Sequence, residues 1–244
     1  MSFHLQPFRA LVIGSSGTIG AQWVRHLKSQ TNCQHIALLS RQTHPYFDLS
    51  QEASIERAAQ DISQEGPFNC IIDATGALVL ELSNSEPNQT LSTLKGPEKN
   101  LASLNSAQLM MAFIVNTIGP ALLLKNLASS LAKGPCVYAK LSARVGSIED
   151  NQKGGWYGYR SSKAAFNMML QTAAIELQRK NPETKVVALQ PGTVLSSLSK
   201  EFIHSSTPCV SVEDSVAGMW LTLQNSEDKK GAQFLDYKGQ SIPW

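Results

Sequence analysis

Short apolar runs alternate with amphipathic segments along the whole chain, beginning near the N-terminus. The first run, residues 9–13, has the sequence Arg-Ala-Leu-Val-Ile and ends at Gly14. Such a run is typical of a strand buried on both faces of a parallel sheet. Residues 18–28 then show a helical pattern that places Ile19 and Trp23 on one face. A buried strand followed directly by an amphipathic helix restricts the chain to a small set of α/β folds.

The same alternation continues to the end of the chain. Further strands are predicted at residues 35–39, 69–73, 136–141, 185–189 and 233–237. Further helices are predicted at residues 54–64, 106–131, 159–179 and 213–224. This order indicates a parallel sheet with helices on both faces. No linker or repeat divides residues 1–244, so we expect a single doubly wound α/β domain, a Rossmann fold, that binds ligands beyond the carboxyl ends of its strands.

The composition is that of a soluble globular protein. Hydrophobic residues make up 42% of the chain, charged residues 16%, and the formal net charge at pH 7 is +2. Without blocks of like charge, the chain is not expected to bind nucleic acid or a membrane surface. The cysteines and histidines are scattered, which predicts reduced thiols and no metal site. Because the N-terminus has no signal pattern and no apolar run is long enough to span a bilayer, we expect a cytoplasmic protein.

A glycine cluster, Gly14-Ser-Ser-Gly17-Thr-Ile-Gly20, lies between the first predicted strand and the first predicted helix. Glycines let the backbone turn sharply and approach a pyrophosphate, while the helix N-terminus supplies amide donors and a partial positive charge. The spacing is neither G-x-G-x-x-G nor G-x-x-x-G-x-G, but its position favours a dinucleotide site over a purely structural turn. The cofactor contacts predicted in this cluster are Gly14, Ser15, Ser16, Gly17, Thr18 and Ile19.

The second predicted strand ends at Ser40-Arg41. A site for NAD usually has an acidic residue here to bind the ribose 2′-hydroxyl, whereas an arginine accommodates a 2′-phosphate. Ser40 and Arg41 therefore predict NADP(H) as the cofactor. The alternative is a solvated loop arginine without a ligand.

Tyr159-Arg-Ser-Ser-Lys163 begins another predicted helix. A tyrosine and a lysine four residues apart lie on one helical face. Free tyrosine has a pKa of ~10, too high for efficient proton exchange at neutral pH, and a neighbouring ammonium favours the phenolate. Tyr159 is thus a candidate general acid or base. A solvated helix pair is the alternative, but the preceding strand and the glycine-rich loop at residues 154–156 favour a reactive centre.

Together these motifs resemble the short-chain dehydrogenase/reductase family and, within it, the group named for the bacterial C-factor. The resemblance covers essentially the whole chain. Besides the glycine cluster it rests on Asp48-Leu49, Asp73-Ala-Thr-Gly76, Val115-Asn-Thr-Ile-Gly119, Leu141-Ser-Ala-Arg-Val-Gly-Ser147, Gly155-Trp-Tyr-Gly-Tyr-Arg-Ser-Ser-Lys163, Gln190-Pro-Gly-Thr-Val194 and Asp236-Tyr-Lys-Gly-Gln-Ser-Ile-Pro-Trp244. The Ser-Ala-Arg-Val-Gly-Ser run and the Ile-Pro-Trp ending are the more group-specific of these.

The resemblance implies an oxidoreductase that interconverts a carbonyl and an alcohol on a small substrate by hydride transfer. Tyr159 would exchange the proton, while Lys163 would lower its pKa and bind the nicotinamide ribose. Asn116 would hold a water in a proton relay, and Ser142 would hydrogen-bond the substrate oxygen. Further cofactor contacts implied by the resemblance are Asp48, Leu49, Ala74, Thr75, Gly76, Asn116, Pro191, Gly192 and Val194.

This chain departs from the family pattern at three places. Ile13 precedes the first glycine where the family usually has threonine, and Asp73-Ala-Thr-Gly replaces Asn-Asn-Ala-Gly. Ala143 occupies the position where many members have the active serine. Ser142 is therefore the candidate for that role and Ser147 the alternative.

Two loops are candidates for determining substrate specificity. Residues 193–208 predict an apolar substrate lid with Leu195, Leu198, Phe202 and Ile203, and the loop at 81–100 matches no motif.

The helices at 106–131 and 159–179 have apolar faces broad enough to pack on the sheet and also to pair subunits, so a homo-oligomer, a dimer or a tetramer, is expected. The sequence also bears on two other functions. A nucleotide-binding signalling or regulatory protein is the alternative, because the C-factor itself is tied to cell–cell signalling. An extended epimerase or dehydratase is rejected because the chain has no room for a substrate domain.

Overall fold

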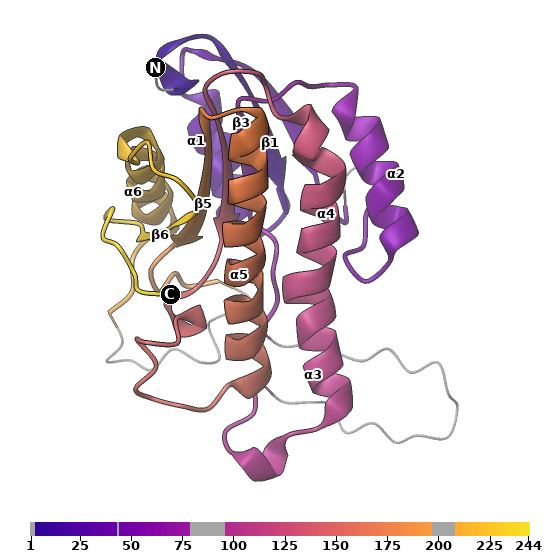
Figure 1. Ribbon diagram of the computed structural model, residues 1–244, viewed down its shortest axis with the longest axis vertical. Coiled ribbons are helices and arrows are strands. Elements are labelled where there is room, and N and C mark those ends of the chain that lie inside the picture. Colours follow the sequence, from indigo (N-terminus) through magenta and orange to yellow (C-terminus); the bar gives the residue numbers. More distant parts are fainter. Residues whose placement is uncertain (1–2, 43, 79–95, 197–207) are drawn as a thin grey trace.

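A parallel sheet with the strand order β2-β1-β3-β4-β5-β6 forms the centre of the computed structural model, which describes residues 3–42, 44–78, 96–196 and 208–244 (Figure 1). Its strands are β1 (Phe8–Ile13), β2 (Cys33–Leu39), β3 (Cys70–Asp73), β4 (Cys136–Leu141), β5 (Thr184–Gln190) and β6 (Gln233–Asp236). All neighbouring pairs in this sheet are parallel. The chain runs from β1 outward to β2 and then crosses to β3 on the other side of β1, so the order reverses between β1 and β3.

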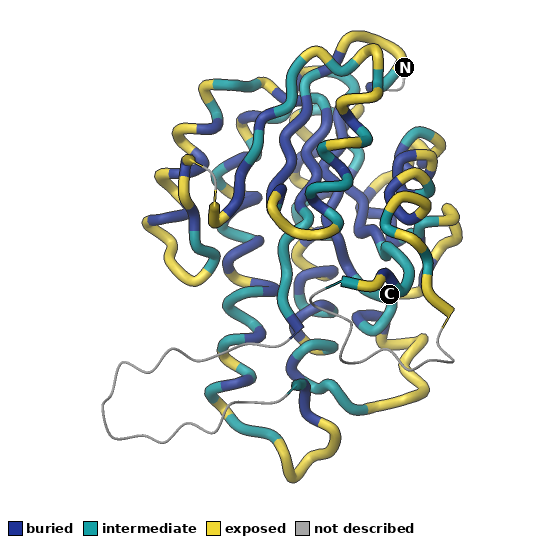
Figure 2. The backbone as a smooth tube through the Cα atoms, turned by 180° about the vertical axis from the view of Figure 1, so that it is seen from behind, coloured by how far each residue is buried: buried dark blue, intermediate teal, exposed yellow. Residues whose placement is uncertain are grey.

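Both faces of the sheet are buried, which explains the continuous apolar runs. In β1, Leu11 and Ile13 belong to one core cluster, and Ala10 and Val12 belong to the other. Successive side chains of a strand point to opposite faces, so a strand covered on both sides needs apolar residues at every position. Figure 2 shows the strands as a buried layer inside a more exposed shell.

Helices cover the two faces in unequal numbers (Figure 1). One face is covered by α2 (Glu52–Ser63), α4 (Gly119–Leu127) and α5 (Tyr157–Lys180), and the other by α1 (Thr18–Lys28) and α6 (Val212–Asn225). The predicted doubly wound α/β fold is therefore confirmed. The predicted strands and helices are each found within two residues of their expected ends, with one exception.

The exception is the single helix predicted at 106–131. The structure instead has α3 (Ser106–Phe113), a wide π-helical turn (Ile114–Ile118) and then α4. Polar side chains are buried at this turn: Thr117 donates a hydrogen bond to the carbonyl oxygen of Ser162 at 2.7 Å. Bonds that leave the helix in this way compete with its regular ladder, and π-turns of this kind occur frequently at functional sites. The apolar period predicted the helix but could not predict its interruption.

The segment Ser106–Ser130 is also long and apolar enough, by length and composition, to cross a membrane. Here one side of it packs against α2 and α5, as expected for a core helix. Its other side leaves Met110 and Ile118 exposed, next to a helix α5 that exposes Met168 and Met169. These apolar faces are the ones from which we expect subunit pairing, and the oligomer stays a prediction.

Both predicted specificity loops fall largely outside the described residues. Residues 79–95 and 197–207 are not described, and the second range includes Leu198, Phe202 and Ile203. Leu195 is described and exposed. The substrate lid therefore stays a prediction.

Trp23 is the largest fully buried side chain, and it packs between α1, α6 and the sheet. Its ring meets that of Trp220 edge to face, with the centroids 6.3 Å apart. We expect Trp23→Ala to lower the free energy of unfolding by about 3–5 kcal/mol, because it removes a large buried side chain and leaves a cavity. Urea denaturation followed by far-UV circular dichroism measures this loss.

The matched control for Trp23→Ala is Leu5→Ala, at a residue that is 67% exposed. It should change the free energy of unfolding by no more than about 0.5 kcal/mol. A loss of less than about 1 kcal/mol in Trp23→Ala would contradict the packing described here.

Candidate functional site

The strands of the sheet end in register, which brings the residues that follow them together. Ile13 is paired with Asp73, Asp73 with Lys140, and Lys140 with Ala188. A cleft of about 480 Å³ opens just beyond this row. It is lined by Gly17, Thr18, Ile19, Gly20, Arg41, Ala74, Thr75, Gly76, Ala77, Leu78, Leu141, Ser142, Tyr159, Lys163, Pro191 and Ser196. A larger hollow of about 650 Å³ between α6, β6 and the C-terminal segment shares none of these residues.

The glycine turn at the end of β1 is shaped by close contacts that exclude side chains. Gly14 has a φ of +77°, and a Cβ at Gly20 would lie 2.1 Å from the carbonyl oxygen of Gly14. Helix α1 then begins after Gly17 without a side-chain cap. The hydroxyl of Ser15 is buried and has no hydrogen-bond partner among the described residues. Uncapped amide donors and an unused hydroxyl at a helix N-terminus fit a bound pyrophosphate.

Arg41 lines the same cleft as this glycine turn, and its side chain is exposed. Ser40 is buried, and its hydroxyl accepts a hydrogen bond from the backbone N–H of Gln42 at 3.1 Å. The arginine therefore lies where a cationic group can meet a phosphate bound near the turn.

Two of the predicted cofactor residues are engaged elsewhere. A carboxylate oxygen of Asp48 accepts hydrogen bonds from both the backbone N–H and the hydroxyl of Ser50, each at 2.8 Å. The carbonyl oxygen of Leu49 would lie 2.3 Å from a Cβ at Gly119. Neither Asp48 nor Leu49 is among the residues that line the cleft.

The residues after β3 and β5 form two walls of the cleft. Ala74, Thr75 and Gly76 line it, and so does Pro191. Gly192 has a φ of +79° and packs on Tyr237 and Val210, where a Cβ would approach both side chains to 2.9 Å. Val194 is buried and forms a bridge with Val210 rather than lining the cleft.

Tyr159 and Lys163 reach the cleft from the first turns of α5. The helix follows Trp156, which has a left-handed backbone with a φ of 56°. Lys163 is buried, and its Nζ donates a hydrogen bond to the carbonyl oxygen of Leu141 at 3.3 Å. The same Nζ lies 5.7 Å from the centroid of the Tyr159 ring. The predicted pair therefore lies together in the site.

Burial shifts the pKa values of these two groups in opposite directions. It raises the pKa of Tyr159 to about 12. Burial, assisted by repulsion from Lys140 and opposed by attraction to Asp73, lowers the pKa of Lys163 to about 7. The shift of the tyrosine is opposite to the one predicted from the neighbouring ammonium, because desolvation disfavours the charged form of each group. At neutral pH Tyr159 is thus a hydroxyl that can donate a proton.

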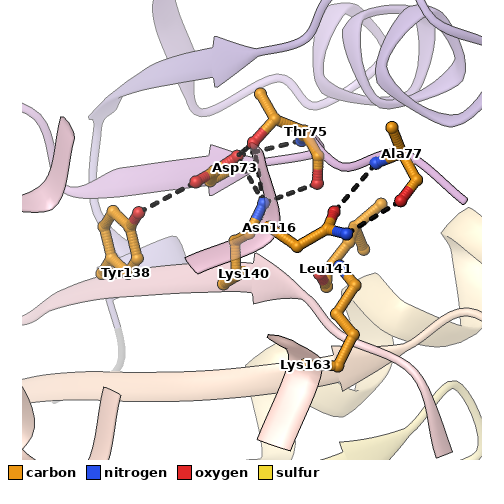
Figure 3. Close-up of polar contacts among 8 residues, drawn as sticks. All are labelled: Asp73, Thr75, Ala77, Asn116, Tyr138, Lys140, Leu141 and Lys163. Carbon is orange, nitrogen blue, oxygen red and sulfur yellow. Dashed lines mark hydrogen bonds and ion pairs between the residues drawn. The ribbon is translucent and has the colours of Figure 1, made fainter. Parts of the chain in front are cut away.

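The side chain of Asn116, in the π-helical turn, forms hydrogen bonds with the loop after β3 (Figure 3). Its Oδ1 accepts a hydrogen bond from the N–H of Ala77, and its Nδ2 donates one to the carbonyl oxygen of Ala77, both at 2.9 Å. Nδ2 also lies 3.3 Å from the hydroxyl of Ser162. The side chain is therefore used to hold the loop, and its predicted part in a water relay stays a prediction.

The two candidate serines lie in different surroundings. Ser142 lines the cleft, and its hydroxyl donates a hydrogen bond to Oδ1 of Asn167 at 2.8 Å. Ser147 is buried beneath the C-terminal segment, where its hydroxyl accepts a hydrogen bond from the N–H of Asp150 at 3.1 Å and lies 3.5 Å from the carbonyl oxygen of Trp244. The geometry therefore favours Ser142.

Sequence reasoning missed two polar residues beside the site, Lys140 and Asn167. Both are buried, Lys140 in the middle of the sheet and Asn167 on the face of α5 that packs inward. The sequence contained a signal for Lys140, because a lysine inside a buried apolar strand requires a charged or polar partner. Asn167 also follows Lys163 by one helical turn and so lies on the same face.

Comparison with known proteins gives consistent matches. The family model described as short chain dehydrogenase matches residues 9–206. The C-signal of Myxococcus xanthus is 31% identical over 146 residues, which cover 59% of this chain and 83% of that protein. The 1-hydroxy-2-glutathionyl-2-methyl-3-butene dehydrogenase of Rhodococcus sp. (strain AD45) is 25% identical over 201 residues, which cover 82% of this chain and 79% of that protein.

Solved structures give the same fold. The NADPH-bound carbonyl reductase from chicken fatty liver has a TM-score of 0.79 at 23% identity, and the match covers 98% of this chain and 100% of that one.

The buried Lys163 predicts a particular pH dependence of stability. Its pKa is about 7 in the folded chain and about 10.4 in an unfolded one. Between these values the unfolded state binds a proton that the folded state does not, so stability rises with pH. We expect the free energy of unfolding of the wild type, minus that of Lys163→Met, to increase from about pH 7 to about pH 9.5.

Urea denaturation across this pH range measures the difference, with Lys153→Met, at an exposed lysine, as the control. The range ends below pH 10 because the raised pKa of Tyr159 has the opposite effect there. A difference that stays constant with pH would contradict the burial of an ionisable Lys163.

Proposed function

The chain belongs to the short-chain dehydrogenase family, and from this premise we propose that it is an NADP(H)-dependent oxidoreductase acting on the carbonyl or alcohol group of a small molecule. The observation that carries the proposal is one cleft lined by Gly17 and the start of α1, Arg41, Tyr159 and Lys163. A site for an anionic dinucleotide and a site for proton transfer are thus adjacent. This is the arrangement that hydride transfer between a nicotinamide and a carbonyl requires.

The residues present fit such a cofactor. The turn from Gly14 to Gly17 and the start of α1 would bind its pyrophosphate, and Arg41 would bind a 2′-phosphate. Ala74 to Gly76 and Pro191 would line it, whereas Asp48, Leu49 and Val194 lie outside the lining of the cleft. The chicken structure, which has the same fold, holds NADPH. When bound, the cofactor supplies or accepts the hydride.

Side chains of this protein would carry out the proton transfer that accompanies hydride transfer. Tyr159 is protonated at neutral pH, so it would donate its proton to a substrate carbonyl oxygen during reduction. Ser142 would hydrogen-bond the same oxygen by turning its hydroxyl proton from Oδ1 of Asn167 toward the substrate. Lys163 would bind the cofactor ribose, and its ammonium could reprotonate Tyr159 after the tyrosine has given up its proton.

A second candidate function is a nucleotide-binding signalling or regulatory protein with little turnover. Two observations favour it: the 31% identity to the C-signal, and Ala143 at the place where the family often has its active serine. Turnover with a carbonyl compound distinguishes the two functions. A cytoplasmic location, a homo-oligomer and the absence of nucleic-acid or membrane partners stay predictions under both.

The cofactor is tested by titrating the purified protein with NADPH and NADH and following nicotinamide fluorescence. We expect NADPH to bind more tightly, and Arg41→Ala to raise its dissociation constant by about tenfold or more, because a charge-assisted contact to a phosphate is lost. NADH binding should change little. Arg57→Ala, at an exposed arginine on α2, is the matched control. Binding of neither nucleotide at micromolar concentration would overturn the enzyme hypothesis.

Turnover is tested by NADPH oxidation in a screen of aldehydes and ketones. We expect Tyr159→Phe to lower kcat by about 100-fold or more while NADPH still binds, because the proton donor is lost. Ser142→Ala should lower kcat by at least about tenfold, and Ser147→Ala should leave it nearly unchanged. Equal losses in the two serine variants would contradict the assignment of Ser142.

A further inference from the structure

A buried ion pair crosses the sheet beside the site. Asp73 and Lys140 lie directly opposite each other on β3 and β4, and both are almost completely buried. Their Oδ1 and Nζ atoms are 2.9 Å apart. Tyr138 donates a hydrogen bond to the other carboxylate oxygen at 3.1 Å (Figure 3). An apolar pair of similar volume would fill such a place at no loss of stability, so packing alone does not explain these charges.

The Lys140 ammonium also anchors the loop that follows β3. Besides Asp73 it contacts the carbonyl oxygen of Thr75 at 2.6 Å and the hydroxyl of Thr75 at 2.8 Å. All three of its protons are thus used. Ala77, two residues after Thr75, is held by two hydrogen bonds with the side-chain amide of Asn116. The loop is therefore fixed on both sides of Gly76.

Gly76 is the point at which this loop touches Lys163. It has a φ of +144°, and a Cβ there would lie 3.0 Å from Nζ of Lys163. Since Lys140 binds the carbonyl oxygen of Thr75, the two lysines contact adjacent residues of the same short stretch of backbone. A displacement of the loop would move the wall against which the Lys163 amine packs.

The charged groups that act on Lys163 in the described structure come from the sheet. They are Lys140, which repels its positive charge, and Asp73, which attracts it. On its own helix, Tyr159 is uncharged at neutral pH, and the remaining contact of Nζ is the neutral carbonyl oxygen of Leu141. The electrostatic environment of Lys163 is therefore set largely by the one ion pair.

We propose that Lys140 is a positioning residue that acts through Lys163. Anchored by Asp73 and Thr75, it fixes the loop that packs on the Lys163 amine and places a second positive charge behind that loop. The importance of Lys140 for catalysis rests on the proposed function. The effect of Lys140 on Lys163 is independent of that function, because it can be measured in the protein without cofactor or substrate.

The test is a pH titration of the full-length protein labelled with ¹³C at the lysine Cε atoms, followed by NMR. The Lys163 signal is assigned by its loss in Lys163→Met. We expect Lys140→Met to raise the pH at which Lys163 titrates by about one unit, because a nearby like charge is removed. Thr75→Val removes the hydroxyl that Lys140 contacts but keeps both charges, so it should shift this titration by clearly less than Lys140→Met does.

Three controls keep this test decisive. Lys133→Met, at an exposed lysine, should change nothing at Lys163. Thermal melting establishes that each variant is folded. If Lys140→Met does not fold, the double variant Asp73→Asn, Lys140→Gln replaces the ion pair by a neutral hydrogen-bonding pair and should also raise the titration pH.

Three results would overturn the proposal. One is an unchanged Lys163 titration in a folded Lys140 variant, and another is an equal rise in Thr75→Val. The third is loss of folding in both Lys140 variants, which would make the pair a requirement of the fold. Failure of the proposed function is distinguishable, because the titration needs neither nucleotide nor substrate. A Lys163 shift without NADPH binding would overturn the function alone.

Discussion

The shared register of the parallel strands is the constraint from which the site follows. Hydrogen bonding across β1, β3 and β4 places Ile13, Asp73 and Lys140 in one row. Because these strands run in the same direction, the segments that leave them all emerge at one edge. The glycine turn, the loop from Thr75 to Ala77 and Ser142 are thus neighbours although they are far apart in the sequence. Helix α5 packs on one face of the sheet, and its first turns bring Tyr159 and Lys163 to the cleft.

Burial at this edge determines the chemistry of the site. The same desolvation keeps Tyr159 protonated and brings the pKa of Lys163 down to about 7. At neutral pH Tyr159 is therefore an uncharged hydroxyl that can donate a proton, and Lys163 is close to its pKa, where it can bind or release one. A bound dinucleotide would add phosphate charges at the other end of the cleft, beside Arg41, where the helix N-terminus and the glycine turn can accept them.

Two of the three departures of this chain from the family pattern lie around the ends of β3 and β4. Asp73 replaces the usual asparagine, Lys140 pairs with it, and Ala143 stands where an active serine is common. These positions lie on adjacent strands, so their substitutions belong to one structural unit. The Asp73–Lys140 pair and the amide of Asn116 together hold the loop against Lys163.

The sequence by itself determined the fold class, the strand order along the chain and the two motifs that meet in the cleft. These are local patterns: a period of two or 3.6 residues, a glycine turn between strand and helix, and Tyr159 one turn from Lys163. They need no knowledge of distant residues. For the same reason the apolar pattern at 106–131 predicted one helix and missed the π-helical turn at Asn116, whose bonds to Ala77 and Ser162 come from other parts of the chain.

Only the tertiary structure decided the rest. It placed Ser142 in the lining of the cleft and Ser147 under the C-terminal segment. It showed that Asp48 is turned toward Ser50 and that Lys140 is paired across the sheet. It also reversed the expected shift of Tyr159, since a pKa depends on how much water reaches a group as well as on its charged neighbours. Long-range pairing and desolvation are properties of the packed molecule, and no local pattern contains them.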